Sequence, residues 1–229
     1  MSLDLLSIYE HATFLISIKK SFLQKPYFYT SRSSQMHQNL VAYIHRYVEM
    51  SDTEIEVFNR YLIKRKISKR EHLIEAQKET CTARYYIVKG CVRLYYFDEK
   101  GNEQIIHFGI DNWWISDYES LVNQLPAKLH IQAIEDTELL ELTTEAFEQL
   151  SKKLPKVERL FRIIMEKTTV AFHNRIAYML SSSGEELYTT FINANPGFCQ
   201  RVPQYMIASY LGMTPEFVSK VRSRTKNNS

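Results

Sequence analysis

The sequence predicts an α+β protein in which helices flank a small antiparallel β jelly roll and two short helices end the chain. Three observations lead to this prediction. Short β-prone runs separated by turn residues fill positions 62–142, a spacing typical of a sandwich or jelly roll. A long stretch with helical periodicity follows, and a glycine turn then joins two amphipathic segments near the C-terminus.

The bulk composition bounds the class of protein. The chain has 229 residues, 45% of them hydrophobic and 24% charged, with a formal net charge of +3. A charge this small does not indicate nucleic acid by itself, so only its local clustering is informative. The longest apolar run near the N-terminus, around residues 14–16, is far short of the ~20 residues that a bilayer span needs. We therefore expect no membrane segment and no signal peptide.

The cysteines indicate neither a metal site nor a disulfide framework. Cys81, Cys91 and Cys199 are scattered and form no CxxC pair, which argues against zinc or an iron–sulfur cluster. Their odd number fits the reducing cytoplasm. We interpret all three as buried or half-buried thiols.

The N-terminal third is predicted to begin with an extension. Residues 1–35 show no sustained period, and Met36 would make a natural first residue of the folded protein. One apolar helical face then comprises Leu40, Ile44 and Val48. Residues 51–54 read Ser-Asp-Thr-Glu, which is a capping box and predicts the start of a second helix.

Six β-prone runs predict the jelly roll. They are residues 62–67, 85–88, 91–97, 104–108, 130–134 and 138–142. Lys89-Gly90 and residues 98–102 have the composition of hairpin turns. Thr143 or Thr144 can cap a short helix after the last strand.

A long helix is predicted from Pro155 to about Leu180. Its heptad-like seam comprises Val157, Phe161, Ile164, Thr168 and Ala171, and it is interrupted by Arg175. Because the helix is apolar on more than one side, we expect it to pack on its own barrel and on a second copy of itself. The alternative is a core helix of a single chain.

The last thirty residues predict a helix-turn-helix. Ala208 is small where two helices would cross, and Gly212 can take the positive φ of a tight turn. Thr214 can cap the second helix and Pro215 fits its first turn. Its remaining surface carries Glu216, Ser219, Lys220 and Arg222.

The charge of this segment favours DNA over an ordinary αα-hairpin. From Thr214 to Ser229 there are four basic residues and one acidic residue. A basic outer face beside an apolar inner face is typical of phosphate contact. The predicted organisation is an extension at 1–35, a sensor barrel with flanking helices at 36–152, a dimerisation helix at 153–182 and a DNA-binding domain at 183–229.

With this order of elements the chain resembles the Crp/Fnr family of bacterial transcription regulators, over roughly residues 36–225. It resembles the Bacteroidetes-type members most, through the C-terminal motif at 202–220. The barrel run at 85–96, His107-Phe108, residues 114–117 and residues 133–140 are also similar. The resemblance implies a barrel like a cyclic nucleotide-binding domain, a homodimer, double-stranded DNA as partner and, for an activator, RNA polymerase.

The resemblance also implies roles for the recognition helix. Family members read bases with Arg-Glu-x-x-x-Arg, whose positions here hold Pro215, Glu216 and Lys220. Glu216 can accept from a cytosine amino group and Lys220 can donate to guanine. Ser219 and Arg222 can contact bases or phosphates, and Gln204 can hold a phosphate at the start of the first helix. The loss of the first Arg puts the family's usual half-site in doubt.

The loop that would hold a cyclic nucleotide departs from the family pattern. Its Gly-Glu pair is replaced by a Trp/Ile region, and no Arg lies in it, so cyclic AMP is not expected. An effector of unknown identity remains an alternative to aromatic filling of the barrel. The candidate pocket residues are Trp114, Ser116, Asp117, Tyr118 and Lys128. No cofactor or metal is predicted.

The sequence therefore predicts a homodimeric, sequence-specific DNA-binding regulator and no enzyme. A cupin-type metal enzyme would need a close His pair with a Glu, but His107 and His130 are isolated. A hydrolase would need a GxSxG elbow, which the sequence lacks. A barrel that binds a partner protein instead of DNA would leave the basic C-terminal helix unexplained.

Overall fold

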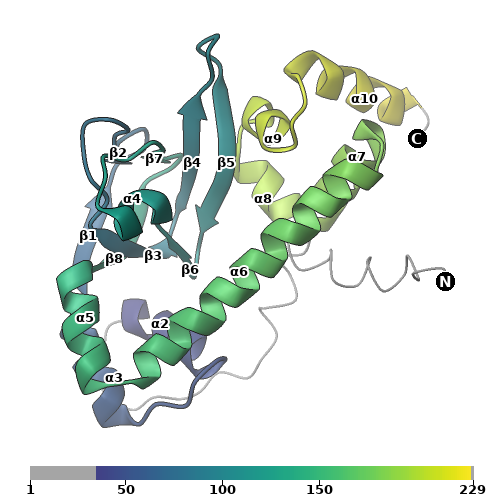
Figure 1. Cartoon of the computed structure of the whole chain (residues 1–229). Helices are drawn as coiled ribbons and strands as arrows, with labels where there is room; N and C mark the ends of the chain where they lie inside the picture. Colours follow the sequence, from purple (N-terminus) through teal and green to yellow (C-terminus); the bar gives the residue numbers. More distant parts are fainter. Residues whose placement is uncertain (1–34, 228–229) are drawn as a thin grey trace, which may run out of the picture. The chain divides into compact units, whose positions relative to one another are not determined.

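A computed structural model of the chain describes residues 35–227 (Figure 1). The predicted extension at 1–35 therefore lies, apart from Gln35, outside the described residues. The described residues form two compact units, which divide within a long helix between Ile163 and Ile164.

The first unit opens with two helices, α2 (Gln35–His45) and α3 (Asp52–Asn59). The hydroxyl of Ser51 accepts a hydrogen bond from the backbone N–H of Glu54, at 3.3 Å. The Glu54 carboxylate accepts one in return from the N–H of Ser51, at 2.7 Å. The capping box predicted at residues 51–54 is confirmed, because both hydrogen bonds satisfy N–H groups that a helix start leaves unpaired.

Eight strands form two four-stranded antiparallel sheets, which confirms the jelly roll. Their bounds are β1 (Ile63–Ile67), β2 (His72–Ile74), β3 (Ala83–Lys89), β4 (Cys91–Phe97), β5 (Glu103–Ile110), β6 (Trp113–Ile115), β7 (His130–Ala133) and β8 (Thr137–Thr143). One sheet has the order β1-β8-β3-β6 and the other β2-β7-β4-β5. The sequence did not predict β2 and β6, which at three residues each are too short to show a period.

Alternation along β3 gives the first unit two apolar layers. Tyr85 and Ile87 face the core that the two sheets enclose, together with Val92 and Ile131 of the other sheet. Because successive strand residues point to opposite faces, Arg84 and Tyr86 lie on the reverse side of the same sheet. Tyr86 there packs edge-on against Tyr43 of α2. The helices therefore cover the outer face of the β1-β8-β3-β6 sheet.

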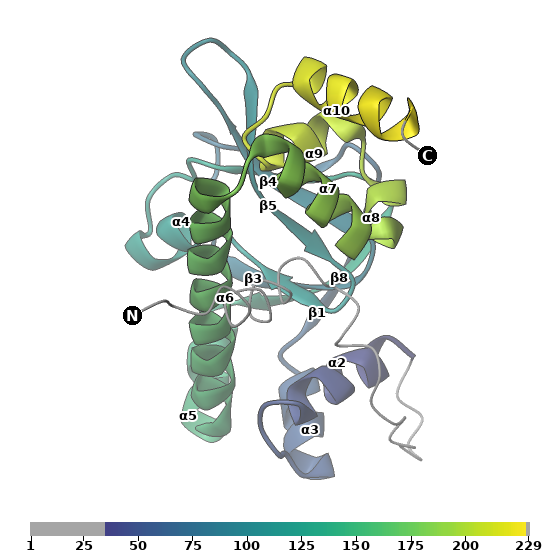
Figure 2. The same cartoon turned by 90° about the vertical axis from the view of Figure 1, so that its right-hand side faces the viewer.

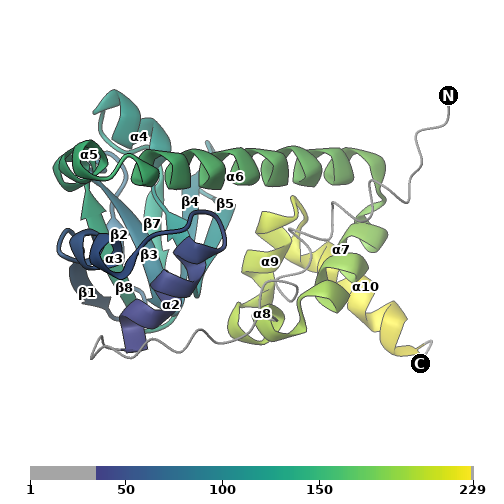
Figure 3. The ribbon, with the colours of Figure 1, turned by 90° about the horizontal axis from the view of Figure 1, so that it is seen from below.

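Helix α4 (Tyr118–Asn123) lies between β6 and β7, and α5 (Thr144–Lys153) and α6 (Lys156–Ser181) follow the last strand. Thr143 caps α5 by accepting from the N–H of Ala146, at 3.1 Å. The prediction of a long helix that follows Pro155 is confirmed, and Figure 3 shows α6 as one uninterrupted helix. None of the helices within residues 35–227 combines the length and the apolar character that a membrane span requires.

The predicted dimer seam on α6 begins with two side chains that the first unit buries. Val157 is fully buried and Phe161 is 5% exposed within a single chain. Phe161 packs edge-on against Trp114 of β6 and Phe147 of α5. Ile164, Thr168 and Ala171 continue the same face by helical spacing. Val157 and Phe161 therefore belong to the core of the first unit, and a dimer contact along this seam stays a prediction.

The second unit continues with four helices, α7 (Gly184–Ala194), α8 (Pro196–Arg201), α9 (Gln204–Tyr210) and α10 (Pro215–Asn227) (Figures 2 and 3). A capping box that was not predicted from the sequence starts α7: the Ser183 hydroxyl accepts from the N–H of Glu186, and the Glu186 carboxylate accepts from the N–H of Ser183. Phe191 of α7 packs on Phe198 and Tyr210, and so joins α8 and α9 to one core.

Candidate nucleic-acid interface and effector pocket

A tight turn joins α9 to α10. Gly212 has a φ of +70°, which is a left-handed conformation that a side chain would strain. Ala208 is fully buried, and its carbonyl accepts a hydrogen bond from the N–H of Met213, at 2.9 Å. Only a small residue at 208 leaves room for this close crossing of two helices. The turn predicted from the sequence is confirmed, and it defines a helix-turn-helix.

Local capping fixes the start of α10. The hydroxyl of Thr214 accepts from the N–H of Phe217, at 3.2 Å. Pro215 is the first residue of the helix, where its missing N–H leaves no hydrogen bond unmade. Val218 and Val221 are buried, at 0% and 2% exposed, and so anchor one side of α10 in the second unit.

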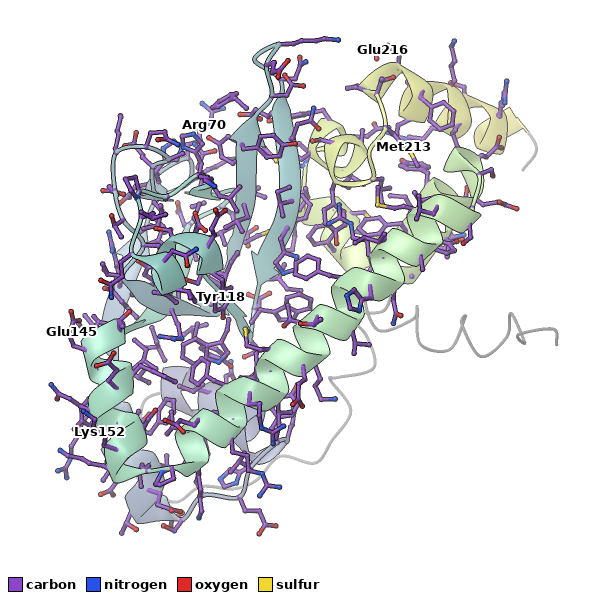
Figure 4. All side chains as sticks on the ribbon, in the orientation of Figure 1. Arg70, Tyr118, Glu145, Lys152, Met213 and Glu216 are labelled. Carbon is purple, nitrogen blue, oxygen red and sulfur yellow. The ribbon has the colours of Figure 1, made fainter. Side chains whose placement is uncertain are left out.

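The opposite side of α10 faces solvent. Glu216, Ser219, Lys220 and Arg222 are all exposed. Figure 4 labels Glu216 at the beginning of the helix. Hydrogen bonds from its own backbone N–H and from the Thr214 hydroxyl hold the pKa of the Glu216 carboxyl below its usual value. The helix thus presents one fixed negative charge at its start and positive charges from Lys220 and Arg222 further along.

Two residues of this surface are linked across the helix-turn-helix. Nη1 of Arg222 on α10 donates a hydrogen bond to Oε1 of Gln204 on α9, at 2.6 Å. This pair joins positions 18 apart in the sequence, and no periodicity predicts it. The hydrogen bond holds Arg222 against the first turn of α9. The Gln204 side chain is also hydrogen-bonded to the hydroxyl of Tyr188 on α7.

The predicted effector residues have separate tasks in the structure. Ser116 donates a hydrogen bond to the carbonyl of Ala83, at 2.9 Å. Asp117 caps α4 through Oδ1, which accepts from the N–H of Ser120, and its Oδ2 accepts from the N–H of Leu129. Lys128 is exposed and forms an ion pair with Glu119. These three side chains hold the loop together and do not converge on a ligand.

Trp114 and Tyr118 differ from the other three. Each of these side chains has a buried polar atom without a hydrogen bond. Neither Nε1 of Trp114 nor the hydroxyl of Tyr118 has a hydrogen-bond partner among the described residues. Burial raises the pKa of Tyr118 to about 12, so its hydroxyl stays protonated at neutral pH. Figure 4 labels Tyr118 where α4 begins.

The cysteines and acidic residues form no cluster of metal-ligand type. Within residues 35–227, no three His, Cys, Asp or Glu side chains gather closely enough to hold a metal ion. Cys81 and Cys91 are buried and Cys199 is half-buried, as expected from the sequence. Burial raises the pKa of the Cys199 thiol to about 11, which keeps it protonated and unreactive.

Comparison with known proteins finds a family match for the barrel and relatives for most of the chain. Residues 64–153 match the cyclic nucleotide-binding domain family. The regulatory protein HlyX of Actinobacillus pleuropneumoniae is 23% identical over 186 residues, which are 76% of this chain and 77% of that protein. The fumarate and nitrate reduction regulatory protein of Vibrio cholerae is 25% identical over 187 residues, which are 76% of this chain and 74% of that protein.

Solved structures share the fold. FixK2 of Bradyrhizobium japonicum aligns with a TM-score of 0.60 at 20% identity and covers 73% of this chain and 85% of its own. The global regulator CLP of Xanthomonas campestris aligns with a TM-score of 0.63 at 12% identity and covers 78% of this chain and 93% of its own.

A jelly roll of the cyclic nucleotide-binding type, followed by a long helix and a helix-turn-helix, defines the class of two-part bacterial regulators. The chain is similar to bacterial regulatory proteins over 76% of its length, in keeping with its resemblance to the Crp/Fnr family. The closer resemblance to Bacteroidetes-type members stays a prediction.

Proposed function

We propose that this protein is a sequence-specific DNA-binding transcription regulator, which acts as a homodimer on a near-palindromic site. The observation that supports this most is the exposed face of α10. Its inward residues are buried valines, whereas Glu216, Ser219 and Lys220 point outward from a helix whose start is fixed by Thr214. A helix of this kind, anchored by a preceding short helix, is the element that enters a major groove.

In this proposal the outward residues of α10 divide into two roles. Glu216 accepts from a cytosine amino group and Lys220 donates to guanine, because these are the base edges that match a carboxylate and an ammonium. Arg222 and Gln204 hold phosphates and position the helix, since their hydrogen bond brings both to the edge of the helix-turn-helix. Pro215 stands where family members carry a base-reading Arg, so the half-site differs from the usual one.

A second copy would cover the exposed side of α6. Val170, Ile176 and Leu180 are 52%, 54% and 84% exposed, which is unusual for large apolar side chains on one helix. Thr169, His173, Ile176 and Leu180 follow the 3-4 spacing of a coiled-coil seam. We therefore transfer the dimer contact from the predicted seam to this face. Pairing two helices would set two copies of α10 about 34 Å apart, one turn of DNA.

The barrel is proposed as the sensor that controls this spacing. A cyclic nucleotide needs a cationic clamp for its phosphate, but the loop offers Lys128, which is already paired with Glu119. We therefore propose an effector other than cyclic AMP. If the protein activates transcription, RNA polymerase is a further partner.

Footprinting of purified protein on DNA fragments recovered by genomic mapping tests the proposal. A regulator protects a roughly two-fold symmetric site at moderate salt, with the two protected halves one helical turn apart. A variant in which Glu216 and Lys220 are both changed to Ala keeps the fold, because both side chains are exposed, but loses the footprint. If the protein is instead an enzyme or a partner-binding module, neither the parent nor the double variant protects a site.

A further inference from the structure

Three hydrogen-bond donors beside the β1-β8-β3-β6 sheet are buried without partners among the described residues; two lie on the helix-covered face, and the third belongs to Tyr118, which packs against the core between the sheets. They are Nη1 of Arg84, Nε1 of Trp114 and the hydroxyl of Tyr118. Buried polar groups in folded proteins are almost always hydrogen-bonded, and each unmade hydrogen bond costs about 1 to 3 kcal/mol. Several such donors close together therefore indicate a bound partner that supplies acceptors.

These donors are grouped around one aromatic side chain. The ring of Phe161 on α6 lies 4.9 Å from the ring of Trp114, centre to centre. The guanidinium carbon of Arg84 lies 5.6 Å from the centre of the Phe161 ring and 4.0 Å from that of Phe147. Arg84 and Tyr118 also interact electrostatically. Strand β3, strand β6, α4, α5 and α6 thus each contribute one side chain to the same place.

Among residues 35–227, Arg84 forms no ion pair with a carboxylate. Within the described part of the chain, the groups that act on it electrostatically are Tyr118 and Cys81, and neither is a carboxylate. Burial lowers its pKa, but a guanidinium remains charged at neutral pH. By contrast, Arg93 of the other sheet, which is buried, is paired with Glu103 and hydrogen-bonded to Gln132. A buried cation without a counter-ion is costly, and an anion would remove that cost.

Three of the side chains at this place are partly exposed. Arg84, Tyr118 and Phe147 are half-buried, whereas Nη1 of Arg84 and the hydroxyl of Tyr118 are themselves buried atoms. The rings of Phe147 and Phe161 supply an apolar wall beside the three donors. An acceptor with two oxygens matches the guanidinium, and a flat apolar body matches the rings.

We infer that Arg84, Trp114 and Tyr118 form a binding site for a small organic carboxylate that carries a planar apolar group. Its carboxylate accepts from Arg84 and from the donors of Trp114 and Tyr118, and its apolar part lies on Phe147 and Phe161. The site rests on the proposed role of the barrel as a sensor and gives that sensor a ligand class. It differs from the predicted pocket, because Ser116, Asp117 and Lys128 take no part and Arg84 is added.

Fluorescence of the full-length protein tests the site without DNA, so its outcome is independent of whether the protein binds an operator. The chain has two tryptophans, and Trp113→Phe leaves Trp114 as the only reporter. Benzoate is the probe, and benzamide is its uncharged match in shape. Benzoate should change the Trp114 emission saturably at concentrations up to about 10 mM, the weak end for a small ligand, and benzamide should not.

Variants in the Trp113→Phe background locate the binding. Arg84→Gln should lower the affinity for benzoate at least about tenfold, as expected for the loss of one charge-assisted hydrogen bond. Tyr118→Phe keeps the ring and should lower the affinity for benzoate several-fold. If Arg84→Gln does not fold, Tyr118→Phe is the variant that tests the site. Arg60→Gln, an exposed arginine of the same unit, should bind as the parent does. No saturable change, equal binding of benzamide, or unchanged affinity in the Tyr118 variant would overturn the site.

Thermal unfolding separates a ligand site from a purely structural Arg84. If the guanidinium is an uncompensated charge, Arg84→Met should unfold at the same or a higher temperature than the parent without ligand. Benzoate should raise the unfolding temperature of the parent only. If instead Arg84 chiefly stabilises the fold by stacking on Phe147, Arg84→Met lowers the unfolding temperature and benzoate shifts neither protein, which contradicts the proposal.

Discussion

The guanidinium of Arg175 on α6 stacks on the ring of Tyr210 on α9, with the guanidinium carbon 3.8 Å from the ring centre. Nη2 of Arg175 also donates a hydrogen bond to the backbone carbonyl of Tyr210. In the sequence Arg175 interrupts an apolar seam, and the structure gives the reason. The residue ties the long helix to the last turn of the first helix of the helix-turn-helix.

Arg175→Ala should therefore destabilise the second unit by about 1.5 to 3 kcal/mol, the range for a hydrogen bond to a charged group. Arg175→Lys should recover little, because an ammonium cannot stack and bond in one plane. Urea unfolding followed by circular dichroism measures the change. Arg159→Ala, at an exposed position on the same helix, is the control and should cost less than about 0.5 kcal/mol. Equal losses in the two variants would mean that the stacked pair stabilises nothing.

Gly212 is expected to tolerate no side chain. Gly212→Ala would hold an alanine at a φ of +70° and place its Cβ 3.2 Å from the terminal methyl of Met179. The cost should be about 1 kcal/mol or more. Gly101→Ala is a matched control, since Gly101 has a φ of +78° and no atom within 4 Å of an added Cβ. Calorimetry should find the larger loss at 212; a larger loss at 101 would contradict the close packing of the turn.

Much of the local structure could be predicted because its causes lie within a few residues. The hydrogen bonds of the capping box at 51–54 and of the Thr214 cap join residues three apart, so the sequence shows both partners at once. The turn at Gly212 could likewise be predicted, because few other residues accept a positive φ. The order of elements followed from these signals and from the period of the strands.

The packed side of α6 and the partners of buried charged side chains could not be predicted in the same way. α6 has apolar residues on two sides, and the side that its own chain covers depends on Trp114 and Phe147, which are distant in the sequence. Periodicity therefore found the helix but could not tell the side that packs on the barrel from the side that a second copy would cover. Arg84 was missed for a related reason: it sits in an ordinary strand pattern, and only the fold shows that it lacks a counter-ion.

The proposed dimer face leads to a direct prediction. Leu180→Glu should convert the dimer to a monomer, because it would place two carboxylates in an apolar contact between helices. Light scattering after gel filtration measures the mass. Val122→Glu makes the same change of character on α4, at a side chain that is 72% exposed, and should leave the dimer intact. A dimer that survives Leu180→Glu and Ile176→Glu would return the contact to another surface.

The hydrogen bond between Arg222 and Gln204 should matter for affinity more than for specificity. Gln204→Ala frees Arg222, and we expect a loss of about 0.5 to 1.5 kcal/mol in DNA binding that is similar for every sequence. Fluorescence anisotropy on the mapped site and on a scrambled duplex measures both affinities. Tyr205→Ala, the exposed neighbour, is a control for the helix start. A loss confined to the mapped site would instead make Gln204 a reader of bases.

Lys220→Ala, measured on a set of duplexes that each differ from the mapped site at one base pair, tests the central claim most directly. If α10 lies in the major groove, the substitution costs about 1 to 3 kcal/mol on the mapped site. That cost should disappear at one base pair in each half-site, where the substituted protein no longer discriminates. An equal loss on every duplex would reduce Lys220 to a phosphate contact, and no loss on any of them would contradict the proposed interface.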